Sequence, residues 1–174
     1  RLRILLDAGA DVIALETIPC RVEVRALCRL LRSYPNARAW LSMACRDETT
    51  LNSGESLAEA VRDIEELDPD GRVCAIGVNC VSPWHVSGLV DTIVRETARP
   101  VLVYPNAGER WDSAAGTWDP AAAVSPARFG ELAREWYAMG VWCVGGCCRI
   151  GPEHIAQVAS AACVIDHSDG RVVE

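Results

Sequence analysis

The sequence predicts an α/β protein built on a parallel sheet. Five short apolar runs alternate along the chain with helical segments, and polar or thiol side chains follow each run at once. Short, almost continuously apolar runs are typical of parallel strands that are covered on both faces. The expected strands are Val12–Leu15, Ala39–Ala44, Val73–Val78, Val101–Val103 and Val141–Val144.

The first half of the chain carries helix signals before and between the runs. The chain opens with apolar residues at helical spacing, so we expect a helix there. A second helix is expected over residues 22–31, where apolar side chains fall on one face. Ser56 and Glu59 form a capping box that predicts a helix over residues 57–67. The apolar positions of the first two helices are Leu2, Ile4, Leu5, Leu6, Val24, Leu27, Cys28 and Leu31.

The second half of the chain has its own start and stop signals. Ser82-Pro83 and Ser125-Pro126 each pair an N-cap residue with a proline in the first helical turn. Gly140 predicts the end of a helix over residues 129–139. A last helix should begin at Gly151-Pro152-Glu153 and run to about Ala162. The polar connection over residues 108–125 is expected to be one extended loop.

The placement of polar residues favours a (β/α)8 TIM barrel over a doubly wound sheet. A barrel builds its site from loops at the carboxyl ends of all strands, whereas a doubly wound sheet binds ligands at one switch point. Five β-α units are too few to close eight strands, so the barrel is incomplete. The residues that follow the five runs are Glu16-Thr17, Cys45, Asn79-Cys80, Tyr104-Pro105-Asn106 and Cys147-Cys148.

Composition excludes several classes of function. The chain has 174 residues and a net charge of −7, without an evident basic patch, which argues against nucleic acid or an anionic membrane as partner. Every basic residue is arginine, which excludes chemistry that needs a lysine. No run spans a bilayer and no signal peptide is evident, so we expect a cytoplasmic protein.

The pattern of the nine cysteines does not indicate a secreted protein held together by disulfides. Their number is odd, and most lie inside apolar runs, so reduced thiols are the better interpretation. The doublet Cys147-Cys148 follows two glycines, and such a turn can aim both sulfurs at one soft cation. Two thiolates leave a tetrahedral ion short of ligands, and Cys80 is the candidate for the third.

Three thiolates with one open position describe a catalytic zinc site. The alternative is three buried, inert cysteines, since cysteine is among the most buried residue types. A redox pair of Cys143 and Cys147 is a weaker alternative, because Cys143 lies inside a strand.

Several polar residues at strand ends are further candidates. Glu16 is suited to bind a substrate ammonium group or to act as a base, and otherwise pairs with a neighbouring backbone group or arginine. Asn79 and Asn106 either contact a ligand or satisfy loop backbone. Glu109 and Arg149 leave the same two possibilities open.

Four segments of the chain together resemble the zinc-dependent homocysteine S-methyltransferase family. They are ALETIP (residues 14–19), GVNC (77–80), YPNAGE (104–109) and GGCCRIGPEHI (145–155), and their order and spacing match over almost the whole chain. With Arg149 directly after the doublet, the chain resembles the bacterial branch of the family, whose members use S-methylmethionine or S-adenosylmethionine.

The resemblance implies a fold and a reaction. Residues 1–174 would form the C-terminal portion of a single homocysteine-binding (β/α)8 barrel domain, strands four to eight, with the N-terminal units missing. The reaction would transfer a methyl group from a sulfonium donor to homocysteine, giving methionine. The family's N-terminal Asp-Gly motif has no counterpart here, so we expect this chain by itself to be inactive.

The resemblance also implies roles for individual residues. Cys80, Cys147 and Cys148 match the three zinc ligands, and Glu16 matches the carboxylate that holds the amino group of homocysteine. Asn79 adjoins the first ligand and is assigned to the substrate site. Two rivals are a zinc-barrel hydrolase with water in the open position, and a non-catalytic fragment whose cysteines bind zinc structurally or not at all.

Overall fold

The structure is a computed structural model that describes residues 1–112, 116–119 and 123–163. Seven strands lie within these residues: β1 (Ile13–Ile18), β2 (Ala39–Met43), β3 (Val73–Asn79), β4 (Val101–Tyr104), β5 (Arg110–Asp112), β6 (Thr117–Asp119) and β7 (Val141–Val144). The α-helices are α1 (Leu2–Asp7), α2 (Arg21–Leu31), α3 (Leu57–Leu67), α4 (Val86–Glu96), α5 (Pro126–Ala138) and α6 (Pro152–Ala162), and a 3-10 turn, η1, covers Pro83–His85.

Five of the strands form one parallel sheet in the order β1-β2-β3-β4-β7. The strands are neighbours in chain order, without the reversal that defines a doubly wound sheet. Right-handed crossovers between successive strands place the connecting helices on one face of such a sheet. The predicted parallel α/β fold is therefore confirmed. Its strand order, sequential along the chain, is the order expected of barrels.

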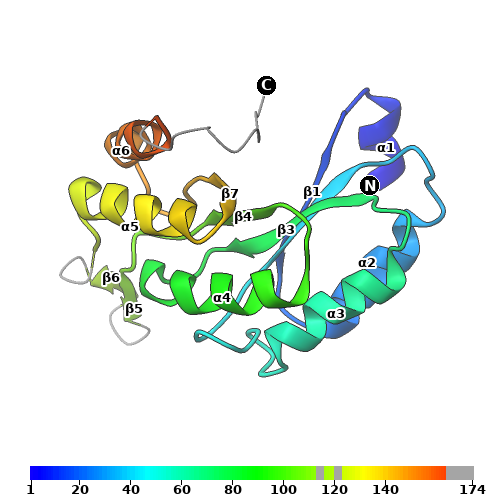
Figure 1. Cartoon of the computed structure of the whole chain (residues 1–174), viewed down its shortest axis with the longest axis horizontal. Coiled ribbons are helices and arrows are strands. Elements are labelled where there is room, and N and C mark those ends of the chain that lie inside the picture. Colours follow the sequence, from blue (N-terminus) through cyan, green and yellow to red (C-terminus); the bar gives the residue numbers. More distant parts are fainter. Residues whose placement is uncertain (113–115, 120–122, 164–174) are drawn as a thin grey trace.

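The helices form a curved layer along one face of the sheet (Figure 1). Neighbours in this layer pack side by side, α2 against α3, α3 against α4, α4 against α5 and α5 against α6. The core fills the space between this layer and the sheet. Its largest fully buried side chains are Trp136, Phe129, Leu31, Leu41, Met43, Leu51, Leu57, Ile64, Ile76, Leu89 and Ile93.

Most of the predicted helix ends are confirmed. The Ser56 and Ser125 hydroxyls accept hydrogen bonds from the backbone N–H groups of Glu59 and Arg128, at 3.4 and 3.3 Å. Gly140 follows the C-cap residue of α5 with φ +96°, a left-handed conformation that glycine adopts without steric cost. The helix that begins after Gly151 ends at Ala162, as predicted.

One expectation about connections is confirmed in part and another is wrong. Ser82 is an N-cap residue with Pro83 in the first turn, as predicted, but they begin the 3-10 turn η1, and α4 starts only after it. Among the described contacts the Ser82 side chain makes no capping bond. The connection over residues 108–125 is not one extended loop, since β5 and β6 pair antiparallel within it. This hairpin extends from the carboxyl end of the sheet (Figure 1).

Gly77 lies where β3 and β4 approach closely. A Cβ atom at this position would lie 1.7 Å from the carbonyl oxygen of Leu102, far inside van der Waals contact. We expect Gly77→Ala to push the two strands apart and to destabilise the protein by roughly 1–3 kcal/mol or more, the usual cost of overpacking. Urea denaturation of the full-length protein measures the loss. An unchanged unfolding midpoint would show that β4 accommodates the methyl group freely.

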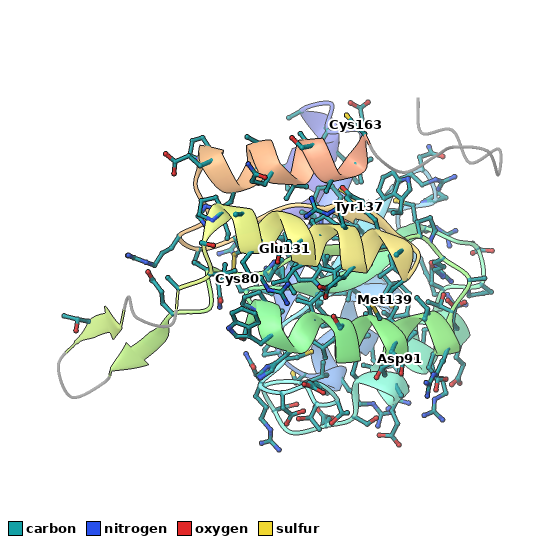
Figure 2. The ribbon with its side chains drawn as sticks, turned by 60° about the vertical axis from the view of Figure 1, so that its left-hand side comes forward. Cys80, Asp91, Glu131, Tyr137, Met139 and Cys163 are labelled. Carbon is teal, nitrogen blue, oxygen red and sulfur yellow. A yellow bond between two sulfur atoms is a disulfide. The ribbon has the colours of Figure 1, made fainter. Side chains whose placement is uncertain are left out.

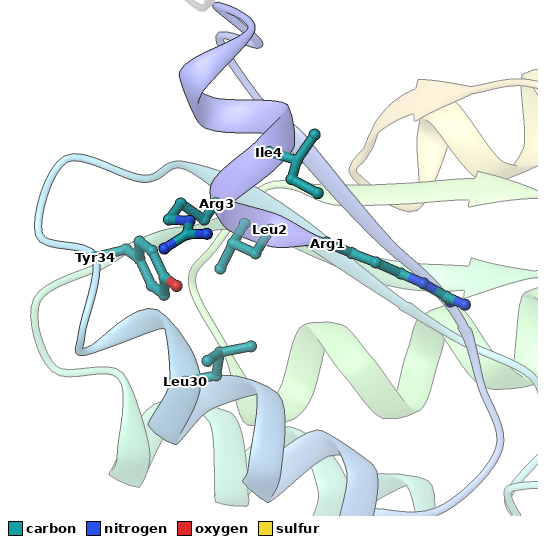
Figure 3. A pocket seen from close by; sticks show the side chains of 6 residues that line it. All are labelled: Arg1, Leu2, Arg3, Ile4, Leu30 and Tyr34. Carbon is teal, nitrogen blue, oxygen red and sulfur yellow. The ribbon is translucent and has the colours of Figure 1, made fainter.

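Two hollows of the surface lie away from the carboxyl ends of the strands. One of about 290 Å³ lies between α1 and the end of α2 and is lined by Leu2, Leu30 and Tyr34, among others (Figure 3). A second, of about 390 Å³, adjoins it. Both border the connection from α2 to β2, at the amino end of the sheet. Within the residues described, no helix is long and apolar enough to cross a membrane.

Candidate metal centre

The end of β3 delivers Cys80 to the carboxyl edge of the sheet. The strand is almost wholly buried up to Asn79, and the chain then turns through Cys80 with φ +51°. The Cys80 amide donates to the carbonyl oxygen of Tyr104 at 3.2 Å, which anchors the turn to the neighbouring strand. Figure 2 labels Cys80 at the end of the molecule from which the β5–β6 hairpin projects.

The end of β4 and the residue after it anchor the cysteine doublet. The amide of Gly145 donates to the Val103 carbonyl at 2.8 Å, and the amide of Cys147 donates to the Pro105 carbonyl at 2.8 Å. A Cβ atom at Gly146 would lie 2.2 Å from the Cγ2 atom of Ile150, so only glycine permits this tight turn. Three consecutive carbonyls, from residues 103 to 105, therefore hold both cysteine-bearing turns in register.

The three cysteines predicted as a cluster meet in space. Their sulfur atoms lie within 4.8 Å of one another. The Sγ atom of Cys148 is 3.9 Å from that of Cys80 and 3.8 Å from that of Cys147. Cys148 is exposed and the other two are half-buried, so the cluster is accessible to a ligand.

Cys80 and Cys147 are joined in a disulfide, with their Cα atoms 5.6 Å apart. The two turns hold the sulfurs of Cys80 and Cys147 within covalent reach of each other. The weaker alternative of a Cys143–Cys147 pair is not found, since Cys147 is bonded to Cys80. The disulfide and a shared metal ion are competing uses of the same two sulfurs, because a metal ligand must be a thiolate.

Two of the three sulfur–sulfur separations in the cluster suit a shared zinc ion. Two sulfurs that bind tetrahedral zinc at about 2.3 Å lie about 3.8 Å apart. The two separations made by Cys148 match this value. Thiolate ligands favour soft or borderline cations such as zinc over magnesium or calcium. Three sulfurs leave one of four positions for a further ligand, which is the arrangement of catalytic zinc.

Two cysteines outside the cluster behave as small apolar residues. Cys28 and Cys45 are buried, and burial raises the pKa of each thiol to about 12. Both therefore stay protonated and unreactive at neutral pH.

Backbone strain is concentrated at the cluster. Among the described residues, the non-glycine positions with left-handed φ are Thr17, Cys80 and Arg149, at +62°, +51° and +64°. Such conformations cost about 1–3 kcal/mol each and persist where the surroundings enforce them. Cys80 directly follows β3 and Arg149 directly follows the doublet, whereas Thr17 lies near the end of β1 and is bonded to Asn79. All three therefore lie at the carboxyl edge of the sheet, which marks this edge as the functional face.

The predicted Glu16 lies on β1, exposed, on the same side of the sheet as Tyr104. Its Oε2 atom is 3.2 Å from the Tyr104 hydroxyl. The Asn79 amide is buried and bonds Thr17 twice: its Oδ1 accepts from the Thr17 backbone at 2.9 Å, and its Nδ2 donates to the Thr17 hydroxyl at 2.8 Å. Asn79 thus fixes the residue after Glu16, and the predicted contact of Asn79 with substrate stays a prediction.

The remaining candidates have structural partners. The Asn106 Oδ1 atom accepts from the Gly108 backbone at 2.8 Å, the loop-satisfying role that the sequence left open. Glu109 and Arg149 form an ion pair beside the doublet, in which the Glu109 side chain is 6% exposed. This pair links the loop after β4 to the turn after β7.

The sequence did not indicate a cluster around Tyr104. The Trp40 Nε1 atom lies 3.1 Å from the Tyr104 hydroxyl, and the Ser42 hydroxyl contacts it as well. One signal was present: Trp40 and Ser42 alternate with buried apolar residues in β2, which places both on the face away from the helices.

The fold and the site define an α/β protein with a cluster of three cysteines, able to hold a metal ion, at the carboxyl edge of a parallel sheet. The chain belongs to the homocysteine S-methyltransferase family, whose model matches residues 1–162. The resemblance predicted from the sequence is confirmed.

Two bacterial homocysteine S-methyltransferases are among the relatives of this chain. The chain is 38% identical over 162 residues to the homocysteine S-methyltransferase YbgG of Bacillus subtilis, covering 93% of this chain and 50% of that protein. It is 37% identical over 156 residues to the homocysteine S-methyltransferase of Escherichia coli, covering 90% of this chain and 49% of that protein. The chain thus spans about half the length of these relatives.

Solved structures show the same fold. The apo crystal structure of the homocysteine methyltransferase MmuM from Escherichia coli matches with a TM-score of 0.75 at 33% identity, covering 92% of this chain and 53% of that chain. An oxidized form matches with a TM-score of 0.76 at 33% identity, and a metallated form with 0.75 at 32%; both cover 91% of this chain and 48% of theirs.

Proposed function

We propose that the protein transfers a methyl group from a sulfonium donor, S-methylmethionine or S-adenosylmethionine, to homocysteine and so produces methionine. The observation that carries this proposal is the convergence of three sulfurs, from two distant segments, at the carboxyl edge of a parallel sheet. Family membership supports the acceptor and the reaction class. Residues 1–174 are then the C-terminal portion of one (β/α)8 barrel domain, contributing strands four to eight.

Cys80, Cys147 and Cys148 are the proposed zinc ligands. When bound there, zinc would hold an incoming thiol as its thiolate, which is the nucleophilic form. The ligands must first be reduced, and the reducing cytoplasm, where we place the protein, keeps such thiols available. Three thiolates around Zn²⁺ leave net negative charge at the site, which keeps the acceptor sulfur electron-rich.

Glu16 is the proposed contact for the α-ammonium group of homocysteine, with Asn79 supporting the same site. The reaction itself needs no base at the methyl group. A lone pair of the homocysteine thiolate forms a new carbon–sulfur bond to the methyl carbon, while the carbon–sulfur bond of the sulfonium breaks. The donor leaves as a neutral thioether, so charge balances without a proton transfer. The protein contributes by orienting the two substrates.

The ligand set argues against the hydrolase rival. Hydrolytic zinc sites are built mainly from histidine and carboxylate ligands, whereas this cluster supplies sulfur alone. Sulfur ligands suit a centre whose substrate is itself a thiol.

The test uses the full-length protein, reduced and loaded with zinc. We expect methionine to form from homocysteine with one of the two sulfonium donors, supplied separately. Metal removal by a chelator should abolish the reaction, and added zinc should restore it. Adding homocysteine alone should release protons from the zinc-loaded protein and not from the metal-free protein, since ligation deprotonates the thiol. Zinc binding without methionine formation from either donor would favour the non-catalytic alternative.

A further inference from the structure

The Tyr104 hydroxyl joins three strands of the sheet. It lies 3.1 Å from Trp40 Nε1, contacts the Ser42 hydroxyl, both on β2, and lies 3.2 Å from the Glu16 carboxylate on β1. Tyr104 itself ends β4, so its side chain reaches across the open face of the sheet.

The chemistry of these groups fixes the direction of each hydrogen bond. The indole N–H of Trp40 can only donate, and a carboxylate can only accept. A tyrosine hydroxyl carries one hydrogen and two acceptor sites. All three contacts are satisfied when Trp40 and Ser42 donate to Tyr104 and Tyr104 donates to Glu16.

The backbone of Tyr104 anchors the turn that carries Cys80. Its carbonyl oxygen accepts the Cys80 amide at 3.2 Å, and the next carbonyl, that of Pro105, accepts the Cys147 amide at 2.8 Å. Tyr104 therefore binds the Cys80 amide through its main-chain carbonyl and the Glu16 carboxylate through its side-chain hydroxyl.

We propose that Tyr104 is a positioning residue that fixes the Glu16 carboxylate relative to the three sulfurs, so that the site selects aminothiols whose thiol and ammonium groups are spaced as in homocysteine. The inference rests on the proposed function and adds to it a determinant of acceptor specificity. Tyr104 occupies one carboxylate oxygen of Glu16 and leaves the other for the ammonium group. Acting through Glu16, Tyr104 need not touch the substrate.

The test compares two acceptors in the zinc-loaded, full-length protein. One is homocysteine, and the other is 4-mercaptobutanoate, the same thiol without its amino group. We expect Tyr104→Phe to raise KM for homocysteine roughly 3- to 10-fold, the effect of losing one hydrogen bond. Zinc content, kcat and the KM for 4-mercaptobutanoate should not change. Tyr34→Phe, at the amino end of the sheet, is the matched control and should behave as wild type.

A double variant separates positioning from general structural damage. Because Tyr104 acts through Glu16, adding Tyr104→Phe to Glu16→Gln should raise the homocysteine KM no further. Equal losses with both thiols, a loss of zinc, or additive effects in the double variant would overturn the inference. A wild-type-like KM in an active Tyr104→Phe variant would overturn it and leave the proposed function standing. A wild-type protein that does not methylate homocysteine would overturn both.

Discussion

Cys148→Ser is expected to remove zinc and methyl transfer together. The Cys148 sulfur lies 3.8 Å from the Cys147 sulfur and 3.9 Å from the Cys80 sulfur, distances expected between two ligands of one zinc ion. A serine hydroxyl is a poor ligand for a zinc ion that is otherwise held by thiolates. Losing even a partner that only supports a metal ligand typically costs 10- to 100-fold in metal affinity, so losing a ligand should cost at least about 100-fold. Elemental analysis after dialysis, together with methionine formation, measures both losses.

Cys148→Ser is more informative than a change at the other two ligands, because it leaves the Cys80–Cys147 pair intact. Cys163→Ser, at an exposed cysteine just after α6, is the matched control and should keep full zinc and activity. A Cys148→Ser protein that retains stoichiometric zinc would remove this residue from the ligand set.

Glu16→Gln should chiefly weaken the binding of homocysteine. The substitution keeps the size of the side chain and removes the charge that pairs with the α-ammonium group. A hydrogen bond to a charged group contributes about 1.5–3 kcal/mol, which corresponds to a rise in KM of roughly 10- to 100-fold. Because the sulfur cluster is untouched, zinc content should stay at the wild-type value. Steady-state kinetics with homocysteine as the varied substrate measures the effect.

The control for this change is Glu23→Gln, an exposed carboxylate in the first turn of α2. It alters net charge by the same amount and should leave KM unchanged. If Glu16→Gln leaves the homocysteine KM at its wild-type value, Glu16 has no part in acceptor binding.

Much of the fold could be predicted because its strands are apolar and its helices carry local signals. The strands at residues 39–43, 73–79 and 141–144 begin where the apolar runs begin, and Ser125 and Gly140 bound α5 as predicted. Local signals failed where tertiary contacts decide. Ser82 and Pro83 begin a 3-10 turn rather than α4 itself, and β5 and β6 are three residues long each, too short for an alternating pattern to be recognised.

The sulfur cluster was predictable because its members are rare residues at strand ends. The carboxyl ends of parallel strands meet at one edge of a sheet, so Cys80 and the doublet had to lie close together. The Tyr104 cluster could not be predicted in the same way. It depends on which side chains reach across β1, β2 and β4, which is a property of sheet curvature and register rather than of spacing along the chain.

Zinc-edge X-ray absorption of the reduced, zinc-loaded, full-length protein tests the proposed zinc centre most directly. We expect three sulfur ligands at about 2.3 Å in the free protein and a fourth sulfur at a similar distance after homocysteine is added. Coordination by nitrogen and oxygen alone, or a shell that homocysteine leaves unchanged, would contradict a thiol-activating zinc centre built from Cys80, Cys147 and Cys148.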